Sequence, residues 1–92
     1  DQTTKIKGMF VRPEQVAALV ARYPEISRAR VIASREGETD VMTVQIEAEG
    51  GDADHYAGAV SDTLKLKARI EIVAKGSLPN DGKVIDDQRS YD

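Results

Sequence analysis

The chain has 92 residues, which is enough for one domain around one modest core. It has no Cys and one His, which excludes a disulfide framework and thiolate chemistry, and no spacing of its carboxylates suggests a metal site. A net charge of -3 with three Tyr, one Phe and no Trp argues against a nucleic-acid partner, and no apolar run reaches the roughly 20 residues that cross a bilayer. The first residues, DQTTKIKG, do not form a signal peptide, and we expect a cytoplasmic protein.

The N-terminal quarter of the chain combines an extended and a helical pattern. Residues 5–11 predict a short strand or hairpin arm, with Ile6 and Phe10 on one side. Pro13 suits the first turn of a helix, and Pro24 ends that helix. Its apolar stripe is predicted to consist of Val16, Leu19, Val20 and Tyr23.

The middle of the chain predicts a hairpin followed by a second helix. Residues 29–34 and 40–49 predict two strands joined through Gly37. The buried side of the second strand contains Met42, Val44, Ile46 and Ala48. Asp52 or Asp54 is the expected N-cap of the helix that follows. The buried face of this helix is predicted to contain Ala53, Tyr56, Ala57, Val60 and Leu64.

A last strand is predicted at residues 68–74, with Ile70, Ile72 and Ala74 facing inward. The order is therefore strand, helix, strand, strand, helix, strand. This order predicts an α+β fold of the ferredoxin-like βαββαβ type, with two helices on one face of a small, mostly antiparallel sheet.

The segment GSLPNDGKV at residues 76–84 is the candidate for a phosphate-binding loop. A nucleotide-binding P-loop needs two Gly five positions apart, then Lys, then Ser or Thr. Here Gly76 and Gly82 are six positions apart and Val84 follows Lys83, so the pattern does not fit. The composition alone predicts a solvated loop, and with Leu78 as its only large apolar residue near the centre we expect it to be mobile.

The other charged residues have simpler interpretations. His55 has no Ser or carboxylate placed to form a catalytic pair, and a surface position is expected. The basic residues of the strands are predicted to be solvated strand edges, with a basic cluster for a phosphate-rich ligand as the alternative. They are Lys5, Lys7, Arg12, Arg28, Arg30 and Arg35.

Two segments together resemble the adenylate-forming enzymes, in the form seen in phenylacetate–CoA ligases. KIKGMFVRPEQV (residues 5–16) is similar to the segment that follows the interdomain hinge of that family. GSLPNDGKVIDD (residues 76–87) is similar to the loop that carries its adenylation lysine. The resemblance covers nearly the whole chain. It implies that residues 1–92 are the single small C-terminal (lid) domain of a larger ligase, with residues 76–92 as catalytic-lysine loop and tail.

The resemblance also implies roles for particular residues. Lys83 corresponds to the catalytic lysine, and Asp1 aligns with the acidic hinge residue. The CoA passage is implied at Gly8, Met9 and Phe10, and support of the loop at Gly76, Pro79 and Gly82. Two departures from the family pattern stand out. Only Asn80 and Asp81 precede the Gly-Lys pair, where many members have a longer loop, and Phe10 stands where the superfamily often has a basic residue.

The reaction implied by the resemblance uses ATP, Mg²⁺ and CoA in two steps. A carboxylic acid, expected to be an aryl acid such as phenylacetate, is first adenylated and then transferred to the CoA thiol as the domain rotates. The large N-terminal adenylation domain is the implied partner, and the absence of an initiating Met indicates a segment of a longer chain. This chain alone is expected to bind none of these molecules and to be inactive. The alternative is a free-standing βαββαβ module that binds a small molecule or regulates.

Overall fold

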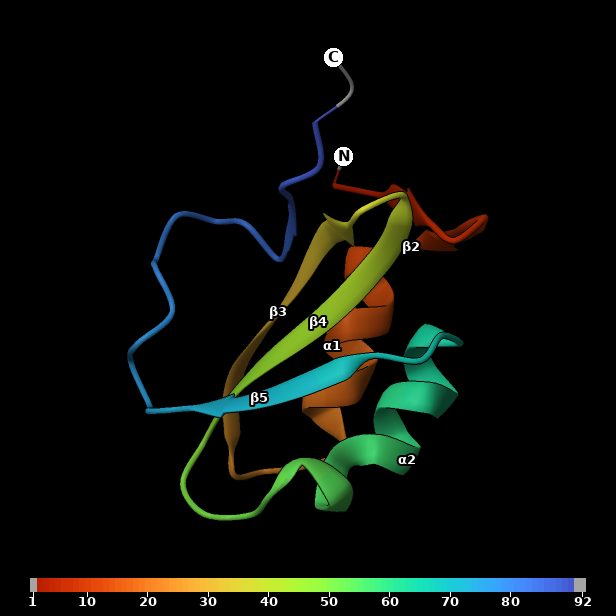
Figure 1. The fold of residues 1–92 in the computed structure, drawn as a ribbon. Coiled ribbons are helices and arrows are strands. Elements are labelled where there is room, and N and C mark those ends of the chain that lie inside the picture. The colour runs from red at the N-terminus through yellow and green to blue at the C-terminus, as the bar shows by residue number, and fades with distance from the viewer. Residues whose placement is uncertain (1, 91–92) are drawn as a thin grey trace.

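The fold is built on a long hairpin, which a computed structural model covering residues 2–90 shows at the centre of a four-stranded sheet (Figure 1). Strand β3 (Ile26–Glu36) pairs antiparallel with β4 (Thr39–Ala48), with Val31 opposite Val44. Both valines are fully buried, as the alternating pattern of β4 predicts. The hairpin therefore supplies one apolar face, and the opposite face carries polar side chains.

Two short strands complete this sheet at its edges, in the order β5-β4-β3-β6. β5 (Arg69–Val73) runs parallel to β4, and β6 (Ile85–Asp87) runs parallel to β3. The α+β class is confirmed, but the fourth strand comes from the C-terminal tail and not from residues 5–11. Because both edge strands pair in parallel, the four-stranded sheet is mixed and the expectation of a mostly antiparallel sheet is wrong. Ala74, expected to face inward, lies beyond the end of β5 and is exposed.

The N-terminal strands form a separate two-stranded hairpin. β1 (Thr4–Ile6) pairs with β2 (Met9–Val11) around a turn in which Lys7 and Gly8 have φ values of 51° and 79°. Two successive positive φ values are typical of a type I′ turn, whose twist matches that of a hairpin. The pairing places Phe10 opposite Lys5 and on the outer side, while Ile6 and Val11 are fully buried. The expectation that Ile6 and Phe10 share a side is therefore wrong.

Two helices within residues 2–90 pack against each other and against the apolar face of the sheet (Figure 1). Helix α1 (Pro13–Ala21) begins with Pro13, and the Gln15 side chain accepts a hydrogen bond from the Arg12 N–H at 2.8 Å. Helix α2 (Ala53–Leu64) begins after Asp52, whose carboxylate accepts from the His55 N–H at 3.0 Å, so Asp52 is the N-cap. The buried face of α2 consists of Tyr56, Ala59, Val60 and Leu64, while Ala57, predicted to be buried, is exposed. None of these described helices is long and apolar enough to cross a membrane.

Candidate functional site

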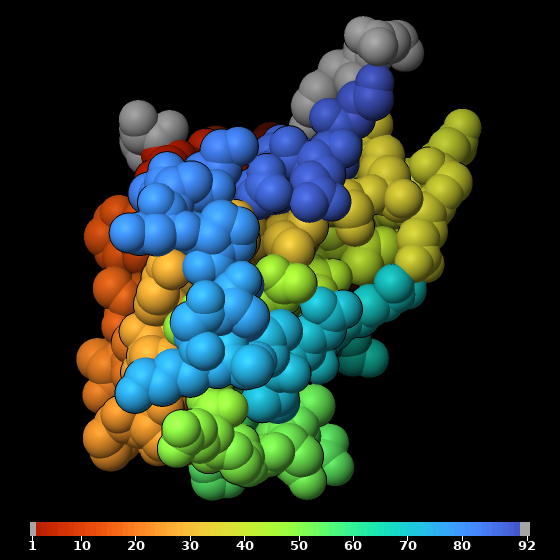
Figure 2. Space-filling view, turned by 90° about the vertical axis from the view of Figure 1, so that its left-hand side faces the viewer, coloured from red at the N-terminus to blue at the C-terminus, as the bar shows by residue number. Residues whose placement is uncertain are grey.

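The segment from residue 74 to residue 84 connects the two opposite edges of the sheet and must cross the sheet to do so. It passes over the face that does not carry the helices, because its contacts are with Arg28, Arg30 and Glu47. Along β3 and β4 these side chains alternate with core residues such as Ala29 and Ile46. Figure 2 shows this segment, in blue, spread over the surface that faces the viewer.

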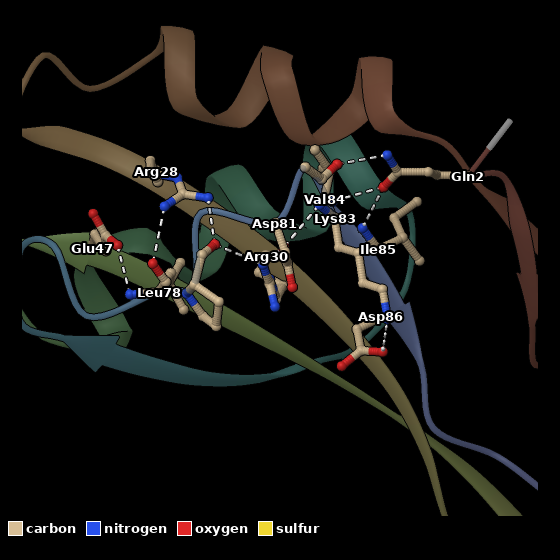
Figure 3. A network of polar contacts seen from close by, with 12 residues as sticks. Gln2, Arg28, Arg30, Glu47, Leu78, Asp81, Lys83, Val84, Ile85 and Asp86 are labelled. Atoms are coloured by element: carbon tan, nitrogen blue, oxygen red, sulfur yellow. Dashed lines mark hydrogen bonds and ion pairs between the residues drawn. The ribbon is translucent and has the colours of Figure 1, made fainter.

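Two arginines of β3 bind the backbone of this loop (Figure 3). Arg28 donates to the carbonyl oxygens of Leu78 at 3.0 Å and of Pro79 at 2.8 Å. Arg30 donates to the same Pro79 oxygen at 3.0 Å and forms an ion pair with Asp81. The Arg30 side chain is only 6% exposed, so the expectation of a solvated strand edge is wrong for this residue.

A buried carboxylate fixes the first half of the loop. Glu47, which is 1% exposed, accepts hydrogen bonds from the Leu78 N–H at 2.8 Å and from the Ser27 hydroxyl at 3.0 Å. The Leu78 N–H holds the pKa of Glu47 below its usual range, although burial acts in the opposite direction. Glu47 is therefore held as an anion, and Leu78 is buried over it.

The backbone around Lys83 is bound by two side chains. The Asp81 carboxylate accepts from the Lys83 N–H at 3.0 Å. The Gln2 side chain donates to the Gly82 carbonyl at 2.8 Å and accepts from the Val84 N–H at 2.6 Å. The loop composition predicted mobility, whereas these contacts and those of the arginines hold the loop at both ends.

The side chain of Lys83, in contrast, is 60% exposed. Its ammonium lies 3.9 Å from the carboxylate of Asp86, and Figure 3 shows it extending away from Gln2 toward that residue. An exposed pair at this distance contributes little to stability, because water competes for both charges. The structure therefore combines a fixed backbone with a charged group that is free to find another partner.

The glycines and the proline of the loop have distinct local roles. Gly76 and Gly82 have φ values of 83° and 77°, in the left-handed region that favours glycine. Pro79 presents the carbonyl oxygen that accepts from both arginines. The chain turns sharply at both glycines, and the turn at Gly82 directly precedes Lys83.

The hairpin turn forms a second candidate region. A Cβ at Gly8 would have open space around it. The neighbouring side chains of Met9 and Phe10 are 46% and 53% exposed, and such exposure of adjacent large apolar residues is typical of an interaction surface. The ring of Phe10 lies 5.6 Å from the Lys5 ammonium and 5.4 Å from the Arg12 guanidinium. Lys7 donates its N–H to Asp40, so the turn is tied to β4 and not to Lys83. The predicted site residues thus fall into two places.

A groove of about 370 Å³ runs beside Lys83, between α1 and β3. Its walls are largely apolar, and Gly82, Lys83 and Val84 form one rim.

Asp1, predicted as the hinge, lies outside the described residues. Within residues 2–90, no three His, Asp or Glu side chains gather into a group that could hold a metal ion.

Sequence reasoning missed four residues of this region. Gln2 and Glu47 were assigned no role, and Arg28 and Arg30 were interpreted as solvated strand edges or as a basic cluster for a phosphate-rich ligand, whereas all four hold the loop. The available signal was the alternation of Arg28 and Arg30 with apolar neighbours in β3, which places both on one face of a central strand. A strand face with two charges needs partners, and the polar loop supplies them.

These features describe a small α+β domain with an exposed lysine on a loop whose backbone is fixed. The family described as "AMP-binding enzyme C-terminal domain" matches residues 8–89, so the chain belongs to this family. The match runs from Gly8, the second residue of the hairpin turn, through the lysine loop, and the resemblance to this superfamily is confirmed. No curated protein matches the sequence.

Solved structures share the fold at low sequence identity. A domain of phenylacetate-coenzyme A ligase from Bacteroides vulgatus ATCC 8482 has a TM-score of 0.84 and 21% identity, over 100% of this chain and 97% of that one. A 2-hydroxyisobutyryl-CoA ligase with 2-HIB-AMP and CoA, in the thioesterification state, has a TM-score of 0.82 and 20% identity, over 98% of this chain and 22% of that one. An anthranilate CoA ligase, AuaEII, with anthranoyl-AMP has a TM-score of 0.63 and 18% identity, over 91% of this chain and 18% of that one. The chain thus spans about a fifth of each of these two ligases.

Proposed function

We propose that the chain is the C-terminal lid domain of an AMP-forming acid–CoA ligase, and that the acid is an aryl carboxylic acid such as phenylacetate. The observation that carries this proposal is the family match across both the hairpin turn and the loop of Lys83. The large N-terminal adenylation domain is the proposed partner in the same polypeptide. That domain would bind ATP and the acid. The groove beside Lys83 on this chain is open and largely apolar, so it does not suit a charged triphosphate.

In the first step, a carboxylate oxygen of the acid bonds to the α-phosphorus of ATP, and pyrophosphate leaves. Negative charge develops on the phosphate oxygens, and a positioned cation stabilises it. Lys83 fits this task, because its ammonium is exposed and its ion pair with Asp86 is long, at 3.9 Å. A lysine is a compact charge on a flexible stem, which suits a group delivered by a moving domain. The proposal assigns Mg²⁺ to the large domain.

In the second step, the CoA sulfur loses its proton and attacks the acyl carbon of the adenylate, and AMP leaves. The proposed passage for CoA is lined by the hairpin turn at Gly8, Met9 and Phe10. A Cβ at Gly8 would have no heavy atom within 4 Å among the described residues, so a side chain there is expected to act on the passage mainly against the partner domain. The two separate regions of this domain thus serve two different steps.

The identity of the carboxylic acid needs its own test. The ligases with similar folds are described for 2-hydroxyisobutyrate, an aliphatic acid, and for anthranilate, an aromatic one. The test measures pyrophosphate release by the longest polypeptide that the gene encodes, with ATP, Mg²⁺ and either phenylacetate, benzoate or 2-hydroxyisobutyrate. We expect release with the aryl acids and none from the 92-residue chain alone. Sustained turnover by the short chain, or no release from the long one with any acid, would contradict the proposal.

A further inference from the structure

One side chain binds the peptide groups on both sides of Lys83. The Gln2 amide nitrogen donates to the Gly82 carbonyl at 2.8 Å, and its oxygen accepts from the N–H groups of Val84 at 2.6 Å and Ile85 at 3.1 Å. Each partner fits only one end of the amide, so the two ends cannot be exchanged. Gln2 precedes β1 and is 80 residues away from Gly82 in the sequence, so this contact depends on the fold and not on local geometry.

A second link binds the backbone N–H of Lys83 itself. Its N–H donates to Asp81 at 3.0 Å, and the same carboxylate oxygen is paired with Arg30. The polar contacts of the Arg30 side chain lie within the loop, at Pro79 and Asp81, and its Nε has no hydrogen-bond partner in the described part of the chain. The Lys83 N–H, with Arg30 as a smaller cause, holds the pKa of Asp81 below its usual range.

We propose that Gln2 and Arg30 are positioning residues for Lys83. They fix the peptide groups before and after the lysine, so that only its side chain moves when the ammonium leaves Asp86 for the substrate. Fixing a catalytic group in advance lowers the ordering cost of the reaction step. This inference rests on the proposed function of Lys83 and adds the residues through which the lysine is held.

The inference also links the lysine to the start of the domain. Gln2 directly follows Asp1, which the family resemblance assigns to the hinge. Gln2 therefore connects the start of the domain to the backbone on both sides of Lys83.

The first arm of the test measures amide hydrogen exchange in the 92-residue chain, whose core lies within the chain itself. Removing one hydrogen bond typically changes a local opening equilibrium by roughly 2- to 10-fold. We expect exchange at Val84 and Ile85 to accelerate by this factor in Gln2→Ala. Gln2→Glu should also accelerate it, because a carboxylate has no N–H to donate to the Gly82 carbonyl and repels that oxygen.

The same arm tests Arg30 and includes a matched control. Arg30→Lys keeps the charge but loses the planar group that spans Pro79 and Asp81, so we expect faster exchange at Lys83. Gln45→Ala removes a glutamine that bonds to Glu71 on β5, and it should leave the loop amides unchanged. Unchanged exchange at these loop amides in both Gln2→Ala and Arg30→Lys would overturn the inference.

The second arm measures adenylation by the longest encoded polypeptide, alone and in a double-mutant cycle with Lys83→Ala. Gln2→Ala and Arg30→Lys should each lower kcat for adenylation by about 3- to 10-fold. The KM values for acid and ATP and the rate of thioester formation from supplied acyl-adenylate should not change. In the Lys83→Ala background, neither variant should lower kcat further, because both act through the lysine.

The outcomes separate the two proposals. If Lys83→Ala leaves adenylation unchanged, the proposed function of Lys83 fails, and its positioning fails with it. If Lys83→Ala removes adenylation while Gln2→Ala and Arg30→Lys leave kcat unchanged, only the positioning inference fails. The positioning inference also fails if each variant lowers kcat by the same factor in the Lys83→Ala background as in the wild type. A structural effect that does not act through the lysine would then explain the loss.

Discussion

Replacing Lys83 by Ala is the most informative perturbation of this domain, because the side chain and the backbone of this residue have different environments. The backbone is bound on both sides, whereas the side chain is 60% exposed and its ammonium is 3.9 Å from Asp86. The substitution removes only this weak surface pair, so the free energy of unfolding should change by no more than about 0.5 kcal/mol. The loop should keep its shape.

The effect on adenylation should be much larger. Loss of one positioned charge at a developing oxyanion typically lowers the rate by about 10²–10³, or roughly 3–4 kcal/mol. The assay measures two half-reactions of the longest encoded polypeptide: exchange of pyrophosphate into ATP, and acyl-CoA formation from supplied acyl-adenylate. Only the first should fall. Lys75→Ala, which removes an exposed lysine just before the loop, is the matched control and should affect neither.

Two results would refute this reasoning. Full adenylation activity in Lys83→Ala would make the lysine an ordinary loop residue. An equal loss in both half-reactions, with the thermal unfolding curve unchanged, would show that the lysine is not used in one domain orientation alone. A lowered melting temperature would instead mean that the side chain contributes to the fold, contrary to its exposure.

Three further predictions concern other parts of the domain. Gly8→Leu should slow thioester formation far more than adenylation, and its positive φ adds a stability cost of about 1 kcal/mol, which Gly8→Asn should largely avoid; equal loss in both half-reactions would indicate misfolding. Asp52→Ala should lower the free energy of unfolding by about 1 kcal/mol in urea titrations, whereas Asp54→Ala should have little effect, because Asp52 alone caps α2; equal effects would contradict this assignment. Because the folded-state pKa of Glu47 is lowered, its stabilising contribution is present above its ordinary value of 4.5 and is lost as the pH falls below it; a Glu47→Gln variant with the same acid dependence as the wild type would refute this.

Local patterns in the sequence predicted the class of fold and both helices. Alternation in residues 40–49 identified β4, because one face of that strand is buried and its period of two is visible in the sequence. Pro13 marked the start of α1, and the pair Asp52 and Asp54 marked the start of α2, where the structure shows Asp52 as the N-cap. The family resemblance identified Lys83 as a candidate, since its motif is contiguous along the chain.

Contacts between distant segments were not predictable in this way. The short β6 strand, Ile85–Asp87, is stabilised by pairing with β3, more than 50 residues earlier, and its three residues carry too little pattern to stand out. The alternation in β3 places Arg30 on one face of the strand but does not indicate its partner Asp81, which is 51 residues away. The contacts of Gln2 could not be predicted for the same reason, because its partners lie 80 or more residues away. A long-range polar contact leaves no periodic signal.

The contacts of Gln2 also constrain the order in which the domain can form during synthesis. The β3–β4 hairpin closes between neighbouring segments and can pair as soon as residue 48 is available. The bonds from Gln2 to Gly82, Val84 and Ile85 close loops of 80 to 83 residues, which have a larger entropic cost and form slowly. The lysine loop can therefore take its final position only after nearly the whole domain has been made. A nascent chain that stops before residue 82 can form the β3–β4 hairpin but not the Gln2 bonds that flank Lys83.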